Sequence, residues 1–271
     1  MPQGTFSATG PTAAILGEDI ARDHDVWGAR FLQPQTLGPI IRNTIAIYVR
    51  YWETICLIYI LPSLPIAMLR DILETYWLSG WVGILFLEML DFFLVSVLGI
   101  AALTVAVSDI CLNLKPNFRR AYRRGFTNGR VFGTYFVAVV LTFLGFALLI
   151  IPGLVMLVWY MFAVSATVLE QISGRAALRR SRELGRGFYW RNLGIFMLCF
   201  VVVLFLAAVA GVLIDFILGP EHQLLENILI EALSIVLFGP LVTIPGILLY
   251  YDMRARKEGY GAAQLVEDLR V

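Results

Sequence analysis

Long apolar stretches alternate with short polar connections along most of this chain. A helix needs about 20 apolar residues to cross the hydrocarbon core of a bilayer. The stretches have roughly this length, so the pattern predicts an all-α integral membrane protein with six transmembrane helices. Proline and glycine in Ile151-Pro152-Gly153 should turn the third span tightly into the fourth. The predicted spans are roughly 53–69, 81–107, 131–151, 153–169, 192–218 and 228–251.

An amphipathic stretch precedes each pair of predicted spans, which suggests a threefold internal repeat of helical hairpins. Residues three, four or seven apart lie on one face of a helix, and here they are mainly apolar. Such helices are expected to lie flat in the headgroup layer, with this face toward lipid. The apolar faces are Ile41, Ile45, Tyr48 and Trp52; Phe118, Tyr122 and Phe126; and Ala177, Ser181, Leu184 and Phe188.

The opposite faces of the second and third amphipathic stretches carry arginine, which can contact anionic lipid phosphate. Specific lipid recognition and ordinary interfacial anchoring both remain open as interpretations. The candidate lipid contacts are Arg119, Arg120, Arg123, Arg124, Arg175, Arg179, Arg182 and Arg186.

The basic residues are distributed asymmetrically about the predicted spans. Twenty of the 21 fall on one side, and only Arg70 falls in a connection on the other. Cytoplasmic loops are enriched in Lys and Arg, so the arginine-rich side and both termini should be cytoplasmic. This predicts a cytoplasmic N-terminal arm (1–35), a six-helix membrane domain (36–252) and a cytoplasmic tail (253–271). Residues 1–35 lack the pattern of a cleavable signal peptide.

Composition agrees with a membrane protein and argues against nucleic-acid binding. Apolar residues make up 59% of the chain and charged residues 15%, against about 45–50% and 25% in soluble domains. A net charge of +1 implies no general attraction to nucleic acid. The three cysteines, Cys56, Cys111 and Cys199, lack metal-ligand spacing and are expected to act as small hydrophobic side chains.

Two groups of carboxylates accompany the predicted spans. Glu88 and Asp91 share one helical face inside the second apolar run, and Asp215 and Glu231 approach the membrane from the same outer side. Acidic side chains within a span are candidates for a cation site or a proton relay. The alternative is that the second run is long enough to place Glu88 and Asp91 in the outer headgroups. Asp109, Glu170 and Asp252 end the even-numbered spans at the inner interface, where the following arginines could pair with them.

No pattern typical of an enzyme was found. The chain has two histidines, His24 and His222, both in polar segments. It contains no phosphate-binding loop, nucleophile elbow, zinc-protease motif or dinucleotide fingerprint. We therefore expect a non-enzymatic protein without a cofactor or a metal site.

Three segments resemble the bacterial family of membrane domains named after glycerophosphoryl diester phosphodiesterase. The resemblance implies a six-helix domain of the bacterial inner membrane, of largely unknown role. The phosphodiesterase domain of that family is a separate soluble barrel, and its activity is not implied here. The resembling segments are 36–42 with 48–50; Glu170 with 176–184 and 187–191; and 250–259.

Two functions follow from these features. The first is a scaffold or accessory subunit of a membrane complex, with anionic lipids and a partner membrane protein as its contacts. The second is a small ion-coupled transporter that uses the outer carboxylates. Glu88 and Asp91 facing a cavity among the second, fifth and sixth spans would favour transport. The same carboxylates facing solvent or headgroups would favour the scaffold.

Overall fold

The computed structural model describes residues 28–76, 80–126, 129–218 and 223–269. The prediction of an all-helical fold is confirmed, because the described residues contain helices and no strand. The 3-10 helix is η1 (Ala29–Leu32). The α-helices are α2 (Leu37–Arg50), α3 (Trp52–Tyr76), α4 (Trp81–Cys111), α5 (Phe118–Gly125), α6 (Arg130–Leu148), α7 (Ile150–Tyr160), α8 (Ala163–Leu169), α9 (Arg175–Gly185), α10 (Tyr189–Leu218), α11 (Gln223–Glu258) and α12 (Ala262–Asp268).

Five helical segments in the described part of the chain are long and apolar enough to cross a membrane. The sixth predicted span falls within α11, which is not among these five. Several long apolar helices are thus compatible with a membrane protein. The five segments are Trp52–Arg70, Trp81–Cys111, Arg130–Leu148, Ile150–Leu169 and Tyr189–Leu218.

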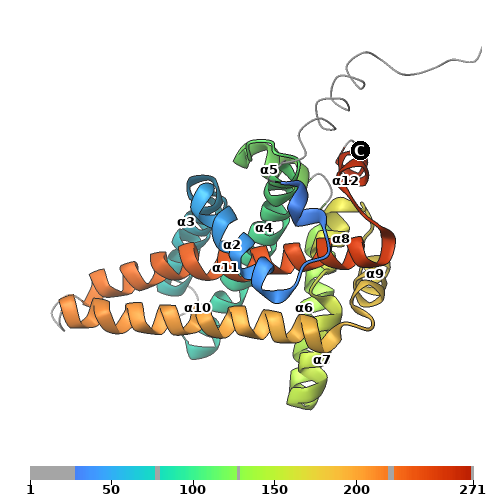
Figure 1. Ribbon diagram of the computed structural model, residues 1–271. Helices are drawn as coiled ribbons and strands as arrows, with labels where there is room; N and C mark the ends of the chain where they lie inside the picture. Colours follow the sequence, from blue (N-terminus) through green and yellow to red (C-terminus); the bar gives the residue numbers. More distant parts are fainter. Residues whose placement is uncertain (1–27, 77–79, 127–128, 219–222, 270–271) are drawn as a thin grey trace, which may run out of the picture.

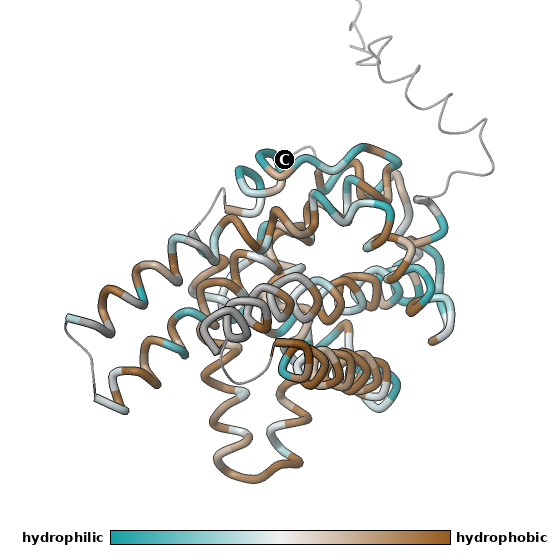
Figure 2. Tube along the Cα trace, turned by 90° about the vertical axis from the view of Figure 1, so that its left-hand side faces the viewer, coloured by the Kyte–Doolittle hydropathy of each residue, from teal (hydrophilic) through white to brown (hydrophobic). Residues whose placement is uncertain are grey.

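The long helices pack as three hairpins, α3 with α4, α6 with α7 and α10 with α11. The hairpins point away from their common packed end in different directions (Figures 1 and 2). Hydrophobic residues run along the α6–α7 hairpin, whereas hydrophilic residues gather around the C-terminal segment that ends in α12 (Figure 2). The hairpins are therefore apolar arms joined at one more polar end of the molecule.

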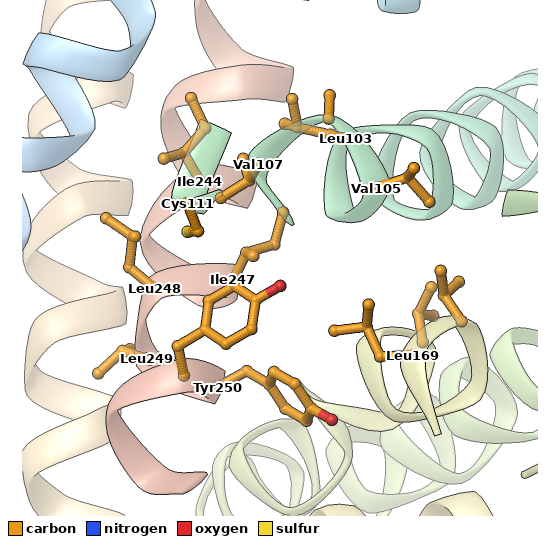
Figure 3. Close-up of a cluster of buried hydrophobic side chains, with 14 of the residues drawn as sticks. Leu103, Val105, Val107, Cys111, Leu169, Ile244, Ile247, Leu248, Leu249 and Tyr250 are labelled. Atoms are coloured by element: carbon orange, nitrogen blue, oxygen red, sulfur yellow. The ribbon is translucent and has the colours of Figure 1, made fainter. Parts of the chain in front are cut away.

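The buried core lies at this joined end, which we call the base. It consists of α4 from Val97 to Cys111, α8, and α11 from Ile244 to Met253, with η1, α2, α5, α9 and α12 packed around them. Figure 3 shows side chains from the three central segments meeting there, among them Leu103, Leu169 and Leu248. Burial of this apolar surface is the main stabilising contribution that the fold can gain outside a bilayer.

Tyr59 of α3 is wedged between α4, its partner in the same hairpin, and α11 of another hairpin. A Cβ atom added at Gly99 of α4 or at Gly239 of α11 would lie 2.4 Å from Cε1 of the Tyr59 ring. The two glycines therefore form the slot that admits the ring. The Tyr59 hydroxyl lies 2.8 Å from the Thr243 hydroxyl of α11, and this hydrogen bond fixes the ring at its polar end.

The turn between the third and fourth predicted spans lies earlier than expected. Helix α6 ends at Leu148, and Leu149 has an extended backbone conformation before α7 begins. Pro152 falls in the first turn of α7, where a missing backbone N–H costs no helical hydrogen bond. Gly153 is required by packing, since a Cβ atom there would lie 2.3 Å from the Phe146 ring. The prediction that Ile151-Pro152-Gly153 forms the turn is therefore wrong.

The apolar faces of α5 and α9 contact the protein instead of lipid, contrary to the prediction. Ala177, Ser181 and Leu184 are buried in the base. The Ser181 hydroxyl donates to the Trp159 carbonyl oxygen at 2.7 Å and accepts from the Phe162 amide at 3.1 Å. The Tyr122 hydroxyl of α5 donates to the carbonyl oxygen of Ile58. Periodicity reveals an apolar face but cannot distinguish a neighbouring helix from lipid as its partner.

Helix α2 differs from α5 and α9, because its predicted apolar face is largely turned outward. Ile45 and Trp52 beside its C-terminal end are 53% and 55% exposed. The face toward the protein carries Ile40, Asn43, Thr44 and Ile47 instead. Two of these buried residues are polar, and the outward apolar face is compatible with the prediction that this face meets lipid.

Both ends of the described chain belong to the base. Gly28 packs so closely against α4 that a Cβ atom would lie 2.4 Å from the Ile110 carbonyl oxygen. Phe31 and Leu32 are buried, as are Tyr260 and Leu265 near the C-terminus. The folded unit therefore extends beyond the predicted membrane domain of residues 36–252 on both sides.

The slot around Tyr59 makes a prediction about stability. Gly99→Ala should destabilise the protein by about 1–3 kcal/mol, because overpacking forces side chains and backbone apart. The ring cannot escape toward α11, since Gly239 contacts its other side. Gly194→Ala on α10 is the matched control, because a Cβ atom there has no neighbour within 4 Å. Thermal unfolding of the purified protein measures both variants, and equal midpoints would contradict the slot.

Candidate functional site

The three hairpins enclose a cavity of about 1080 Å³ above the base. Its lining comes from α3, α4, α6, α7, α8, α10 and α11, so every hairpin contributes to it. Most of the lining side chains are apolar, with five phenylalanines at positions 92, 143, 146, 196 and 200. Phe92 and Phe143 are 58% and 57% exposed, so the cavity opens to the surroundings between the hairpins. Sites for small ligands are commonly concave and mostly apolar in this way.

Hydroxyl groups are interspersed with the apolar lining. The Tyr59–Thr243 pair lies on the cavity wall, and Ser63, Ser96 and Tyr135 also line it. Deeper toward the base, the Ser165 hydroxyl lies 3.4 Å from the Thr104 hydroxyl, which donates to the Ile100 carbonyl oxygen at 2.7 Å. These groups give the apolar cavity a small number of fixed hydrogen-bonding positions.

The charged side chains of the cavity wall are grouped on α3 and α4. Arg70 Nη1 lies 3.4 Å from Glu88 Oε1 and 3.7 Å from Asp91 Oδ2. The Asp91 and Arg70 side chains are 20% and 17% exposed, whereas Glu88 is 51% exposed. Both predicted carboxylates therefore face the cavity, and the single basic residue of the outer connections lies between them.

The distance along α4 places this charged group far from the base. Asp91 precedes Asp109 by 18 residues on one helix, which corresponds to about 27 Å of rise. The hydrocarbon core of a bilayer is about 30 Å thick. If Asp109 lies near one membrane interface, Asp91 lies close to the other.

The remaining outer carboxylates do not join this group in the described structure. Asp215 on α10 is exposed and does not line the cavity. The side chain of Glu231 lies outside the described residues, as do His24 and His222. Over the residues that the structure describes, no three His, Cys, Asp or Glu side chains are placed to hold a metal ion. Of the four predicted carboxylates, Glu88 and Asp91 line the cavity, Asp215 does not, and the position of Glu231 stays a prediction.

The three inner carboxylates form ion pairs at the base. Asp109 Oδ1 lies 3.3 Å from Arg120 Nη2, and Glu170 Oε2 accepts from Arg180 Nε at 2.7 Å. Both arginines belong to the basic helix that follows the carboxylate, α5 and α9 respectively. Sequence spacing had suggested these pairs, and the structure contains them.

Asp252 is fully buried and has the most extensive contacts of the three. Its carboxylate accepts hydrogen bonds from Arg191 Nη1 at 2.7 Å, from Arg256 Nε at 3.0 Å and from the backbone N–H of Gln35 at 2.6 Å. The two arginines also donate to the Gln35 carbonyl oxygen, at 2.6 and 2.8 Å. The Gln35 side chain in turn accepts from Asn43 Nδ2 at 2.8 Å. Distance in sequence concealed this network, because Gln35 and Asp252 lie 217 residues apart.

Arg180 and Arg254 extend the ion pairs toward the C-terminus. Burial disfavours the charged form of Arg180, but bonds to Glu170 and to Glu258, at 2.6 Å, outweigh it and raise the pKa of Arg180. Arg254 pairs with Asp268 at 2.6 Å and lies 3.7 Å from the centroid of the Tyr260 ring. These contacts attach α12 to the end of α11.

The candidate lipid-contacting arginines lie at the outer surface of the base. The Arg182 guanidinium stacks 4.1 Å from the Trp159 ring and donates to the Tyr160 hydroxyl at 3.1 Å. Arg124 is partly buried and donates to the Asp268 carbonyl oxygen at 3.4 Å. The exposed members are Arg119, Arg120, Arg123, Arg175, Arg179, Arg182 and Arg186.

Comparison with known proteins gives a family but no function. The model of a family described as a domain of unknown function, DUF7847, matches residues 66–244. The chain belongs to the DUF7847 family. No curated protein and no solved structure matches it.

The matched range of this DUF7847 protein contains most of the cavity. Arg70, Glu88 and Asp91 fall inside it, as does every other lining residue except Tyr59, Ser63, Gly246 and Ile247. The match leaves out two of the three segments on which the resemblance to the phosphodiesterase-associated membrane domains rests, and it does not confirm that resemblance. The cavity therefore lies largely within the region that defines the DUF7847 family.

Proposed function

We propose that this protein is a small membrane transporter whose substrate, an apolar or amphipathic molecule, occupies the cavity between the three hairpins. The observation that carries this proposal is the position of Glu88 and Asp91, which face the cavity together with Arg70. Charged side chains are costly at the wall of a mostly apolar cavity, so their presence there favours a role in ligand contact. An accessory subunit would need neither the cavity nor these charges.

The proposed arrangement in the membrane has six spans, in the cytoplasmic membrane of a bacterium, and both termini in the cytoplasm. Helix α11 supplies the sixth span, and the base lies at the cytoplasmic interface. The support is the placement of twenty of 21 basic residues on one side of the predicted spans. In this arrangement the three hairpins form a threefold repeat, each entering the membrane after an amphipathic helix. The cavity then opens toward the outer leaflet.

Reporter fusions test the topology. Fusions after residues 75, 152 and 222 should report a periplasmic location, and fusions after residues 122, 182 and 262 a cytoplasmic one. The physical reason is the retention of arginine-rich segments on the cytoplasmic side. A cytoplasmic signal after residue 222 would contradict the six-span arrangement.

Two adjacent valines on α6 test the cavity. Val139 lines it, whereas Val140 is 37% exposed and lies outside the lining. Val139→Trp should fill part of the cavity and at least halve the amount of apolar or amphipathic compound that co-purifies with the protein. Val140→Trp adds the same side chain outside the cavity and should leave that amount unchanged. Mass spectrometry of organic extracts from both variants makes the measurement, and equal amounts would contradict a cavity-bound substrate.

A second proposed function is that of a scaffold bound to anionic lipid through its arginine-rich helices. The supporting observation is that α5 and α9 bury their apolar faces in the base while their arginines remain exposed. A basic surface at the membrane interface attracts anionic headgroups. This function is compatible with transport, because the exposed arginines of α5 and α9 do not line the cavity.

Substituting Arg175, Arg179 and Arg186 together by Gln tests the lipid contact. Arg182 is left unchanged because its stacking on Trp159 would mix a packing effect into the result. The triple variant should bind vesicles containing anionic lipid more weakly, since each basic residue near such a surface contributes about 1 kcal/mol. The same three substitutions to Lys keep the charge and serve as the control. Flotation with vesicles measures both, and undiminished binding of the Gln variant would rule out the contact.

A further inference from the structure

The charges of the cavity wall are distributed unevenly. Among the described residues that line it, the Asp, Glu, Lys and Arg side chains are Arg70, Glu88 and Asp91. All three belong to the α3–α4 hairpin, on the side away from the base. The rest of the lining is aromatic, aliphatic or hydroxylated. A molecule that matches this cavity carries its charge at one end and an apolar chain at the other.

The sign of the charged end follows from counting the ionised groups. Two carboxylates face one guanidinium, which gives this part of the wall a formal charge of −1. The ion pairs are long, at 3.4 and 3.7 Å, and Glu88 is half exposed, so its carboxylate is accessible to a ligand. A cationic headgroup would neutralise the excess charge, whereas an anionic one would add to it. In a partly dehydrated cavity this difference is larger than in water.

The orientation follows from the position of the charges along the helices. Cavity-lining residues on α4 run from Glu88 to Ile100, a rise of about 18 Å. The headgroup lies at the Glu88 end, where the proposed topology has the outer headgroup layer. The apolar chain runs toward the base between Phe92 and Phe200. Entry between the exposed phenylalanines avoids transfer of the chain through water.

From this geometry we propose that the ligand of the cavity is an amphipathic molecule with a cationic, amine-type headgroup held by Glu88 and Asp91. Arg70 Nη1 lies 3.4 Å from the Glu88 carboxylate and 3.7 Å from that of Asp91, so it holds the two acidic side chains close together at the cavity wall. This inference rests on the proposed cavity function and specifies the substrate class for it.

Three probes with the same chain and different headgroups test the inference. Dodecylammonium, dodecanol and dodecanoate compete with a pyrene-labelled long-chain alcohol for the purified full-length protein in a non-ionic detergent. Fluorescence anisotropy reports the bound alcohol. Dodecylammonium should displace it at about tenfold lower concentration than dodecanol, which corresponds to one favourable charge interaction of about 1.4 kcal/mol. Dodecanoate should be the weakest competitor.

Variants assign the preference to the two carboxylates. Glu88→Gln combined with Asp91→Asn should abolish the advantage of the ammonium probe and leave dodecanol binding intact, because amides keep the shape and lose the charge. Arg70→Gln should increase the advantage. Asp215→Asn removes an exposed carboxylate outside the cavity and should change nothing. Comparison of the same probe between a variant and the wild-type protein in the same detergent cancels the partition of that probe into micelles. If the double variant does not fold, Glu88→Gln alone makes the same test at a half-exposed position.

The outcomes separate the inference from the proposed function. Equal affinity for ammonium and alcohol, or a preference for dodecanoate, overturns the cationic headgroup and leaves the cavity function standing. A preference for ammonium that survives the double substitution also overturns the assignment. Failure of the labelled alcohol to bind, or binding that Val139→Trp does not weaken, overturns the cavity function and the inference with it.

Discussion

The base depends on the ion pairs and hydrogen bonds of one buried carboxylate, that of Asp252. A charge with no solvent contact is tolerated only when paired and hydrogen-bonded, and removing its partners costs several kcal/mol. The Asp252 carboxylate on α11 accepts hydrogen bonds from Arg191 of α10, from Arg256 of its own helix and from the backbone N–H of Gln35. A single carboxylate thereby fixes the segment before α2, the start of α10 and the end of α11. Asp109 and Glu170 attach α5 and α9 to the ends of α4 and α8 in a similar way.

A base held in this way allows the hairpins to diverge. The helices pack most completely where Gly99 and Gly239 admit Tyr59, and farther from the base they separate around the cavity. Helix α10 illustrates the consequence, because long stretches of it, including Phe205, Val212 and Phe216, remain exposed. Such surface is unfavourable in water and favourable in lipid. The same divergence leaves apolar helix surfaces exposed, which is compatible with a membrane protein, and creates the space that we assign to a ligand.

The charged group of the cavity wall and the arginine-rich surface lie at opposite ends of α4. Between them runs α4, which carries Glu88 and Asp91 near one end and Asp109 near the other. Arg120 contacts Asp109, so the basic surface and the cavity wall share one helix. This connection gives the two proposed functions, binding to lipid headgroups and binding of a ligand in the cavity, one shared helix.

Local sequence patterns were sufficient to predict the helices and the asymmetry of charge, because these depend on composition. They also predicted that Asp109 and Glu170 pair with the basic helix that follows each of them, because the partners, Arg120 and Arg180, are about ten residues away. Tertiary structure decided which faces are buried. The apolar face of α9 packs on the base, whereas Ile45 of α2 points outward, although both faces have the same periodicity. It also decided the pairing of Gln35 with Asp252 and the meeting of Arg70 with Glu88 and Asp91. Hydropathy measures what each residue prefers to contact, but only the packing of distant helices determines which partner it meets.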